Sequence, residues 1–330
     1  MPDQWNHKIF GVQRFDFDKL SLEAFQYQLR NNTVYNNYVK ALGVNPATVN
    51  SVSQIPFLPV SFFKSHSIKA SEFTAETVFE SSGTTGSINS RHLVKDLLLY
   101  KESFTKGFEF SYGPVTDWCI IGLLPSYIER DNSSLVYMVN ELIKLSSHPL
   151  SGFYLNEYEK LSAMLEEAEA KQQKTLLIGV TFALLDFAER FPLQLKYTVI
   201  METGGMKGRR KEMIRAEVHD LLKKGFGITA VHSEYGMTEL LSQAYSKGEG
   251  IFSAPPWMKV LLRDEEDPLA VKETGAGIIN IIDLANIHSC CFIATDDAGK
   301  VYGDGSFEVL GRMDAVSYTH LRAHETGRNL

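Results

Sequence analysis

The sequence has few of the features that mark a secreted, membrane-spanning or metal-stabilised protein. Its 330 residues include three cysteines, Cys119, Cys290 and Cys291, which have neither the spacing of a metal site nor the number of a disulfide framework. No run of about 18 apolar residues predicts a membrane span. The polar N-terminal segment has no apolar core of the kind found in signal peptides. We therefore expect a cytoplasmic protein in a reducing environment.

Basic clusters are absent as well. The formal net charge is −7, and lysines and arginines form no tract along the chain, which argues against a nucleic-acid-binding surface. The composition, with 44% hydrophobic and 22% charged residues, is that of an ordinary globular protein. The length suffices for one large or two ordinary domains. We expect a folded protein that binds no nucleic acid and spans no membrane.

The middle of the chain alternates between apolar strands and amphipathic helices. The expected strands are residues 118–124, 175–180, 197–202 and 228–231, and the expected helices include 158–168, 182–190 and 214–222. Continuously apolar strands in such an alternation predict an α/β fold with mostly parallel sheets covered by helices. From residue 251 onward the strands become shorter, which predicts a smaller β-rich region near the C-terminus.

The N-terminal part of the sequence predicts helices followed by an extended connector. Leu20, Phe25 and Leu29 recur at helical spacing within the first 50 residues. Two prolines favour an extended, buried segment over residues 55–64. Further along, residues 91–108 predict a helix.

One short stretch is rich in residues that surround phosphates. After a short strand ending at Phe79, residues 81–86 read Ser-Ser-Gly-Thr-Thr-Gly. Backbone N–H groups and hydroxyls in such a loop can wrap phosphate oxygens, and glycines let the backbone approach them closely. The string is neither a Walker loop nor a Rossmann fingerprint. On composition alone, a flexible surface turn is the simpler interpretation.

Three further patches of glycine and polar residues follow in chain order, the first two after expected strands. They are Gly204-Gly205, the string Ser-Glu-Tyr-Gly-Met-Thr-Glu at 233–239, and residues 295–297 together with 311–314. In parallel sheets, ligands bind beyond the carboxyl ends of the strands. Each patch alone is also explained by a turn, a core aromatic residue or a helix-terminal charge.

Together the four patches resemble, in content and order, the motifs of the adenylate-forming (ANL) superfamily. The resemblance implies that the backbone of Gly204 and Gly205 lies against adenine, and that the phosphate loop closes over the β- and γ-phosphates of ATP. That loop comprises Ser81, Ser82, Gly83, Thr84, Thr85 and Gly86. In the Tyr-Gly-x-Thr-Glu motif, the ring of Tyr235 would stack on adenine beside Gly236. Thr238 would contact the α-phosphate and Glu239 would ligate Mg²⁺, a cation that prefers oxygen ligands.

The last patch is implied to bind ribose. A carboxylate of Asp296 or Asp297 would accept both ribose hydroxyls, and the superfamily pattern Thr-x-Asp favours Asp297. Arg312 would contact ribose or phosphate near a hinge. His92 and His232 also lie close to the motifs in sequence, but a lone histidine is usually structural.

Within the superfamily, roughly residues 50–314 resemble the LuxE-type acyl-protein synthetases, notably at residues 55–64 and 124–139. The resemblance implies ATP-dependent activation of a fatty or other carboxylic acid as an acyl-adenylate, followed by transfer to a protein thiol. An acyl-reductase or a carrier protein would be the partner. Coenzyme A, as in the related phenylacetate–CoA ligases, is an alternative acceptor. A non-catalytic nucleotide-binding protein of the same fold is a third interpretation. The association with bioluminescence comes with the family name alone.

The end of the chain departs from the family pattern. We assign residues 1–311 to an adenylate-forming N-terminal domain and residues 312–330 to a hinge with a truncated or foreign tail. Residues 315–330 lack a sustained apolar face, so we expect them to be no part of the folded unit. A second departure follows the glycine loop, where Ser87-Ile88 replaces the common Pro-Lys.

Overall fold

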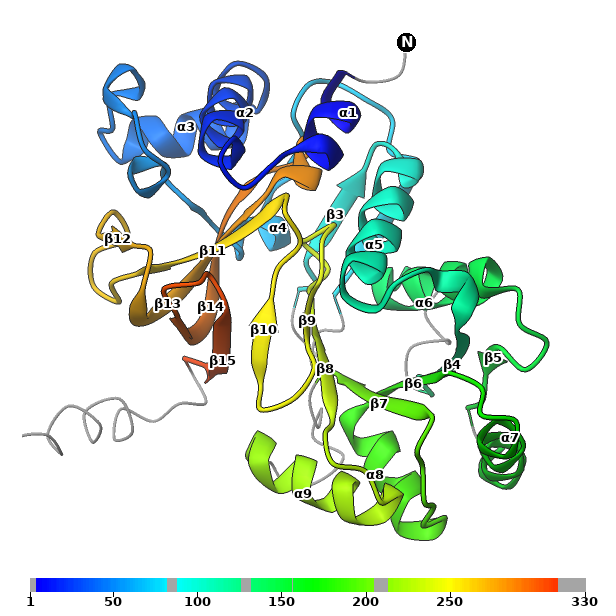
Figure 1. The fold of residues 1–330 in the computed structure, drawn as a ribbon. Helices are drawn as coiled ribbons and strands as arrows, with labels where there is room; N and C mark the ends of the chain where they lie inside the picture. Colours follow the sequence, from blue (N-terminus) through cyan, green and yellow to red (C-terminus); the bar gives the residue numbers. More distant parts are fainter. Residues whose placement is uncertain (1–3, 82–87, 126–131, 156, 205–212, 314–330) are drawn as a thin grey trace, which may run out of the picture. The chain divides into compact units, whose positions relative to one another are not determined.

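The chain forms two compact units in its computed structural model, which describes residues 4–81, 88–125, 132–155, 157–204 and 213–313. One unit combines the described parts of residues 1–74 and 256–330, and the other comprises those of residues 75–255. Figure 1 shows helices and strands in both units. The mixed α/β composition confirms the predicted fold class.

The unit of residues 75–255 is built on a parallel sheet. Parallel pairs join its strands in the order β5-β4-β6-β7-β8, and β9 and β10 continue from β8 in antiparallel fashion. The strands are β4 (Cys119–Leu123), β5 (Gly152–Phe153), β6 (Thr175–Val180), β7 (Thr198–Thr203), β8 (His232–Tyr235), β9 (Ala244–Ser246) and β10 (Ile251–Ser253). Every residue of β4 and β6 is buried, as expected for strands covered on both faces.

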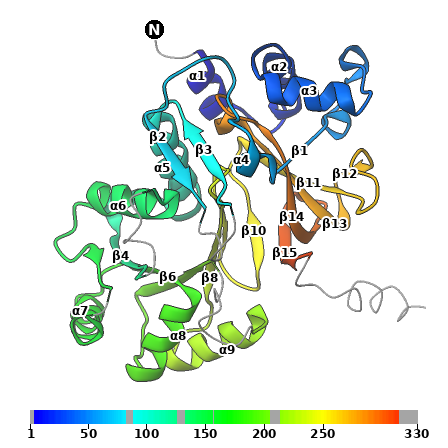
Figure 2. The same ribbon diagram turned by 180° about the vertical axis from the view of Figure 1, so that it is seen from behind.

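Helices flank this sheet (Figures 1 and 2). α8 packs against α9, β6 and β7, whereas α6 packs against α5 and β4. The helices of this unit are α5 (Leu97–Tyr112), α6 (Ser134–Ser146), α7 (Tyr158–Ala170), α8 (Thr181–Arg190) and α9 (Arg215–Phe226), with the short helix η3 (Val115–Asp117). In α7, Leu161, Leu165 and Ala168 form a buried stripe at the predicted helical spacing.

A separate hairpin flanks the glycine-rich segment. β2 (Thr77–Glu80) and β3 (Arg91–Val94) pair in antiparallel fashion. The sequence-based prediction of helix is wrong for residues 91–94, because they complete a ladder with β2. The helix begins only after Asp96, whose carboxylate accepts the backbone N–H groups of Leu98 (2.8 Å) and Leu99 (3.3 Å).

The other unit combines an antiparallel sheet with the N-terminal helices. Its strands follow the order β12-β11-β13-β14-β15, and β1 pairs with β14 in parallel. They are β1 (Leu58–Pro59), β11 (Met258–Arg263), β12 (Val271–Lys272), β13 (Gly275–Asp283), β14 (Phe292–Val301) and β15 (Phe307–Arg312). This sheet is the β-rich region that the sequence predicted near the C-terminus. The expectation of shorter strands there is wrong, because β13 and β14 have 9 and 10 residues and form long antiparallel ladders with their neighbours.

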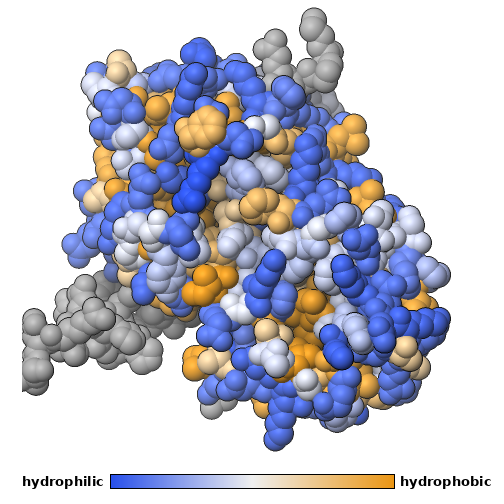
Figure 3. Space-filling model, viewed as in Figure 1, coloured by the Kyte–Doolittle hydropathy of each residue, from blue (hydrophilic) through white to orange (hydrophobic). Residues whose placement is uncertain are grey.

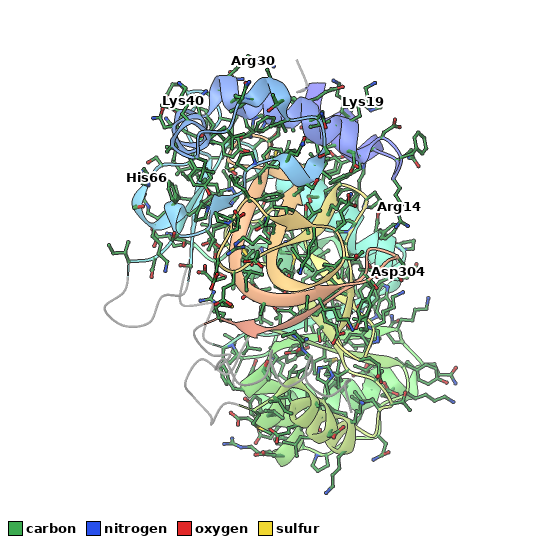
Figure 4. All side chains as sticks on the ribbon, turned by 90° about the vertical axis from the view of Figure 1, so that its left-hand side faces the viewer. Arg14, Lys19, Arg30, Lys40, His66 and Asp304 are labelled. Carbon is green, nitrogen blue, oxygen red and sulfur yellow. The ribbon has the colours of Figure 1, made fainter. Side chains whose placement is uncertain are left out.

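The helices of this unit carry basic side chains outward. They are α1 (Gln4–Gly11), α2 (Phe17–Asn31), α3 (Thr33–Ala41) and α4 (Phe62–Ser65), with η1 (Pro46–Thr48), η2 (Val52–Gln54) and η4 (Leu284–Asn286). Figure 4 shows Lys19, Arg30 and Lys40 along the outer side of α2 and α3. There Arg14 lies beside Asp304, to whose carbonyl it donates a hydrogen bond of 2.8 Å. This bond joins the segment after α1 to the turn between β14 and β15.

An aromatic cluster fills the core between these helices and β14. The ring of Phe292 lies 6.2 Å from Phe25, 5.8 Å from Tyr35 and 6.2 Å from Phe57, measured between centroids. The hydroxyl of Tyr35 donates to the carbonyl of Pro56 at 2.6 Å. The predicted extended connector is therefore buried at its start, although its end turns into α4.

The structure corrects the position of one strand that matters for the site. Residues 228–231 were expected as a strand because of their apolar side chains, but the strand is β8, four residues later. Its partner β7 sets this register, with Met201 opposite His232 and Thr203 opposite Glu234. Ser233, Glu234 and Tyr235 therefore belong to the strand itself rather than to a loop after it.

The surface is mixed in character. On the face shown in Figure 3, apolar residues lie in small patches separated by hydrophilic ones, as is usual for protein surfaces in water. No helix in the described part of the chain combines the length and the apolar character that crossing a membrane requires.

Candidate functional site

Two of the predicted motifs leave the sheet side by side. Because β7 and β8 are parallel neighbours with Thr203 opposite Glu234, Gly204 and Tyr235 follow at the same edge of the sheet. Gly204 has a φ of +69°, a conformation that glycine adopts without strain. Gly205 lies outside the described residues.

Two cross-strand pairs hold these strand ends together. On one face of the sheet, the hydroxyl of Ser233 donates to the carboxylate of Glu202 at 2.9 Å. On the other face, the hydroxyl of Thr203 donates to the carboxylate of Glu234 at 2.5 Å. Each strand thus supplies one carboxylate and one hydroxyl, and the two pairs fix the spacing of the segments that follow.

Glu202 is a buried, charged member of this arrangement, with 9% of its surface exposed. Burial acts to raise the pKa of its carboxyl. The pKa is nevertheless lowered, because His219, Arg215 and the hydroxyls of Ser233 and Thr181 favour the charged form. The hydroxyl of Thr181 also lies 2.8 Å from the carbonyl of Gly204. Through Thr181, whose single hydroxyl proton is offered to Glu202 and to Gly204, the network around Glu202 extends to the backbone of Gly204.

Glu234 behaves in the opposite way. Burial raises the pKa of its carboxyl to about 7, the hydroxyl of Thr203 opposes this shift, and the charge of Glu202 adds to it. A Cβ at Gly236 would lie 2.5 Å from Glu234 Oε1, so the glycine of the motif makes room for this carboxylate. Glu234 was not among the residues predicted from the sequence, although it stands directly before the Tyr-Gly pair.

The rest of the Tyr-Gly-Met-Thr-Glu motif forms the strand end and a tight turn. The ring of Tyr235 packs edge-on against Phe252 with 5.9 Å between centroids. The N–H of Leu240 donates to the carbonyl of Met237 at 3.1 Å, which closes the turn. Within it, Glu239 is 6% exposed.

The two histidines noted in the sequence have different neighbours. His232 lies 3.0 Å from the hydroxyl of Tyr112 through Nδ1, and burial, assisted by the charge of Lys247, lowers its pKa to about 4. These contacts are those of a structural histidine. His92, on β3, instead touches the motif itself, with Nδ1 at 2.8 Å from the carbonyl of Thr238.

The base of the glycine loop is fixed by two hydrogen bonds between Ser81 and Ser90. The N–H of Ser81 donates to the carbonyl of Ser90 at 3.0 Å, and the N–H of Ser90 donates to the hydroxyl of Ser81 at 2.9 Å. Of the predicted loop residues, Ser81 is thus described, with its hydroxyl already accepting a bond. The others lie outside the described residues, namely Ser82, Gly83, Thr84, Thr85 and Gly86.

The predicted ribose carboxylates lie in an irregular part of β14, in the other unit. Pairing with β13 passes from Ile278 opposite Ala298 to Asn280 opposite Ala294, which leaves residues 295–297 outside the regular ladder. Such bulges re-aim side chains. Within this bulge, the N–H of Asp297 donates to the hydroxyl of Thr295 at 3.1 Å.

Asp297 and Asp296 differ in their surroundings. Asp297 pairs with Arg312 across β14 and β15, and Arg312 Nε lies 3.8 Å from Asp297 Oδ1. Asp296 is exposed. A residue that the sequence did not single out, Arg263, braces the bulge by donating to the carbonyl of Thr295 at 2.6 Å.

Comparison with known proteins identifies the family. A family model described as "Acyl-protein synthetase, LuxE" matches residues 12–316. The chain belongs to this family. Relatives from Aliivibrio fischeri and Vibrio harveyi, both named long-chain-fatty-acid--luciferin-component ligase, are 25% and 22% identical to it, and each match covers 91% of this chain and 82% of the relative. The predictions of a LuxE-type family and of a ligase are confirmed.

Solved structures of adenylate-forming enzymes share the fold of this LuxE-family chain. 2-Hydroxyisobutyryl-CoA ligase, in the postadenylation state in complex with R3-HIB-AMP, gives a TM-score of 0.65 at 11% identity and covers 95% of this chain and 72% of its own. ATP-bound MatB from Rhodopseudomonas palustris gives a TM-score of 0.55 at 18% identity, with 73% of this chain covered. The LuxE-family chain spans 49% of the length of MatB. At these identities the likeness concerns the fold, and it confirms the predicted adenylate-forming architecture.

Glu234 is expected to make the stability of this LuxE-family chain depend on pH. Its pKa rises from 4.5 to about 7 on folding, so the folded state retains a proton that the unfolded state releases in this range. The contribution of Glu234 to the free energy of unfolding should therefore fall as the pH rises from about 4.5 to about 7 and then stay level. The full shift corresponds to roughly 3 kcal/mol, and partial exposure of the side chain makes the expected loss smaller.

Chemical denaturation of the Glu234→Gln variant tests this expectation. The glutamine does not titrate, so the variant should gain stability relative to the wild type between about pH 5 and about pH 8. Glu166→Gln, which removes an exposed carboxylate on α7, is the matched control and should show no such gain. If the difference in the free energy of unfolding between Glu234→Gln and the wild type stays constant with pH, the raised pKa of Glu234 is contradicted.

Proposed function

We propose that this chain activates a carboxylic acid, in the first place a long-chain fatty acid, as an acyl-adenylate and then passes the acyl group to a thiol. The family membership and the names of the two relatives support this substrate class. The observation that carries the proposal is the exit of Gly204 and Tyr235 from the same edge of a parallel sheet, where nucleotide ligands of α/β proteins bind.

The adenine ring would lie between the backbone of Gly204-Gly205 and the ring of Tyr235. Phe252 packs edge-on against that ring. The two cross-strand pairs, each of a hydroxyl and a carboxylate, maintain the spacing of the two segments. The hydroxyl of Thr238 would donate to the α-phosphate. The glycine loop at residues 81–86 would supply N–H groups and hydroxyls to the β- and γ-phosphates.

Glu239 is the residue that would hold Mg²⁺. The described residues contain no group of three or more His, Cys, Asp or Glu side chains that would form a complete metal site. A single carboxylate fits Mg²⁺, because this ion is usually bound by one or two carboxylates together with substrate phosphates and water. When bound, the ion neutralises phosphate charge that develops during the reaction.

The first half-reaction is an in-line displacement at the α-phosphorus. An oxygen of the substrate carboxylate forms a bond to this phosphorus, and the bond from phosphorus to the bridging oxygen breaks, so that pyrophosphate leaves. The contribution of the chain is to hold both reactants in line and to stabilise charge with positioned donors. In the second half-reaction, a thiolate attacks the acyl carbon and AMP departs.

The acceptor thiol is expected to come from outside the three cysteines of this sequence. Cys119, Cys290 and Cys291 are buried, and burial raises the pKa of each thiol, to about 12 for Cys290. A buried thiol with a raised pKa supplies little thiolate and is a poor nucleophile. We therefore propose that the acceptor thiol is none of these three, and that a thiol of a partner protein or coenzyme A is a candidate for it.

Asp297→Ala is expected to weaken ATP binding more than Asp296→Ala does. Asp297 would accept both ribose hydroxyls, and each hydrogen bond to a charged group contributes about 1.5–3 kcal/mol. Its pairing with Arg312 fixes the carboxylate, whereas Asp296 is exposed. Calorimetric titration with ATP measures the ranking. If Asp296→Ala has the larger effect, the ribose-binding residue of the motif is Asp296 rather than Asp297.

ATP–pyrophosphate exchange with a panel of carboxylic acids tests the proposed function. We expect exchange that requires both the acid and Mg²⁺, with long-chain fatty acids more effective than short or aromatic ones. Subsequent addition of coenzyme A or of a candidate acceptor protein identifies the thiol. ATP binding without exchange for any acid would instead support a non-catalytic nucleotide-binding protein.

A further inference from the structure

We propose that His92 is a positioning residue that couples the β2–β3 hairpin, which flanks the glycine loop in sequence, to the Thr238-Glu239 segment. This inference rests on the proposed function, in which the glycine loop and the Thr238-Glu239 segment both contact the phosphates of one nucleotide. The two segments are far apart in sequence, and the bond between His92 and Thr238 spans 146 residues. It connects the hairpin that flanks one segment with the backbone of the other.

His92 occupies a rigid part of the hairpin. It lies opposite Phe79 in the β2–β3 ladder, two residues beyond Ser90, which closes the base of the loop together with Ser81. Its side chain is 1% exposed. A displacement of His92 would therefore move the strand from which the loop emerges.

The hydrogen bond has a defined direction. A carbonyl oxygen only accepts, so Nδ1 of His92 carries the proton and donates it to Thr238 at 2.8 Å. Burial lowers the pKa of the imidazole to about 4, although the carbonyl of Thr238 favours the protonated ring. The ring is thus neutral across the physiological range, and the coupling should not change with pH there.

The accepting carbonyl occupies a sensitive position. It belongs to the peptide group between Thr238, the predicted α-phosphate contact, and Glu239, the predicted metal ligand. The turn closed by the N–H of Leu240 and the carbonyl of Met237 surrounds it. By fixing this peptide plane, His92 fixes the direction in which the side chain of Glu239 leaves the backbone. Misplacement of a catalytic group by about 1 Å can cost on the order of 100-fold in rate.

Two substitutions of similar polarity separate positioning from simple core packing. In His92→Asn, the amide nitrogen replaces Nδ1 and can still donate to Thr238, whereas in His92→Gln the amide reaches the position of Nε2. We expect His92→Gln to lower kcat of pyrophosphate exchange about 30- to 100-fold, with little change in the KM for the fatty acid. His92→Asn should stay within a few-fold of the wild type.

Two controls accompany this pair. His232→Gln alters a half-buried histidine of the same unit, one that contacts Tyr112 rather than the motif, and should leave kcat unchanged. The deficit of His92→Gln should also stay constant from about pH 6.5 to about pH 9, because the neutral ring does not titrate there. Equal rates for His92→Asn and His92→Gln at equal melting temperatures would overturn the proposal.

A direct binding measurement distinguishes failure of this inference from failure of the proposed function. If the wild type binds Mg²⁺-ATP but catalyses no exchange, the proposed activity is wrong. The coupling then still predicts that His92→Gln weakens Mg²⁺-ATP binding and that His92→Asn does not. Equal affinities of the two variants, or a wild type that binds no ATP, would overturn the inference.

Discussion

Glu239→Gln is expected to lower the rate of acyl-adenylate formation by roughly 10³-fold or more, comparable to the largest losses seen when one transition-state stabilising group is removed. The substitution preserves the size of a side chain that is 6% exposed, so the fold should be retained. It removes the charge with which this residue would hold Mg²⁺, and neutral amides are weaker ligands for a hard cation. Pyrophosphate exchange at saturating ATP and fatty acid measures the loss.

The Mg²⁺ dependence of the same assay shows whether the charge is what matters. Glu239→Gln should need more Mg²⁺ than the wild type to reach half of its own maximal rate. Glu166→Gln, on the exposed face of α7, removes the same charge elsewhere and should behave like the wild type. Normal exchange by Glu239→Gln would remove Glu239 from the proposed metal site.

A double substitution in the glycine loop, Thr84→Ala with Thr85→Ala, is expected to weaken ATP binding about 10²- to 10⁴-fold. Two hydroxyls that donate to phosphate oxygens would contribute about 1.5–3 kcal/mol each, and about 1.4 kcal/mol corresponds to a tenfold change in affinity. Because the loop is proposed to contact the β- and γ-phosphates, AMP should bind the variant as well as it binds the wild type.

Equilibrium titrations with ATP and with AMP make this comparison. Ser87→Ala, one residue beyond the loop string, is the matched control and should change ATP affinity less than threefold, within about 0.6 kcal/mol. If the double variant binds ATP with unchanged affinity, the string is an ordinary surface turn. If it loses ATP and AMP binding equally, the loop supports the whole site rather than the terminal phosphates.

The parallel sheet was predictable because its central strands are apolar on both faces. The bounds of β6 agree with the predicted residues 175–180. A strand that is buried on both faces is a continuous apolar segment, which the hydrophobicity of the sequence reveals. β8 was not predicted because it lacks such an apolar run. Its residues are polar, and their position in a strand depends on pairing with β7, which lies about 30 residues away in the sequence.

Local propensity also failed where tertiary pairing decided the structure. Residues 91–94 form a strand because β2 offers a partner, and the helical pattern of the following residues gives no warning of this. The cap residue Asp96 marked the true start of α5. The sequence contained that signal, but an acidic residue is common in many other settings.

The motif residues of the candidate site were found through resemblance to a family, whereas the contacts that support these residues were not predicted. Glu234, His92 and Arg263 act through contacts with Thr203, Thr238 and Thr295, respectively. Each of these contacts joins residues 31 to 146 positions apart. One sequence read along its length gives no information on such pairs, so only the folded chain reveals them.

Direct detection of an acyl-adenylate tests the central claim most closely. The protein is incubated with ATP, Mg²⁺ and a long-chain fatty acid in the absence of any thiol acceptor, and the products are analysed by mass spectrometry. We predict acyl-AMP bound to the protein and an equal amount of released pyrophosphate, both abolished in Glu239→Gln. Release of ADP and phosphate, or no consumption of ATP with any carboxylic acid, would contradict the assignment of this chain as an adenylate-forming ligase.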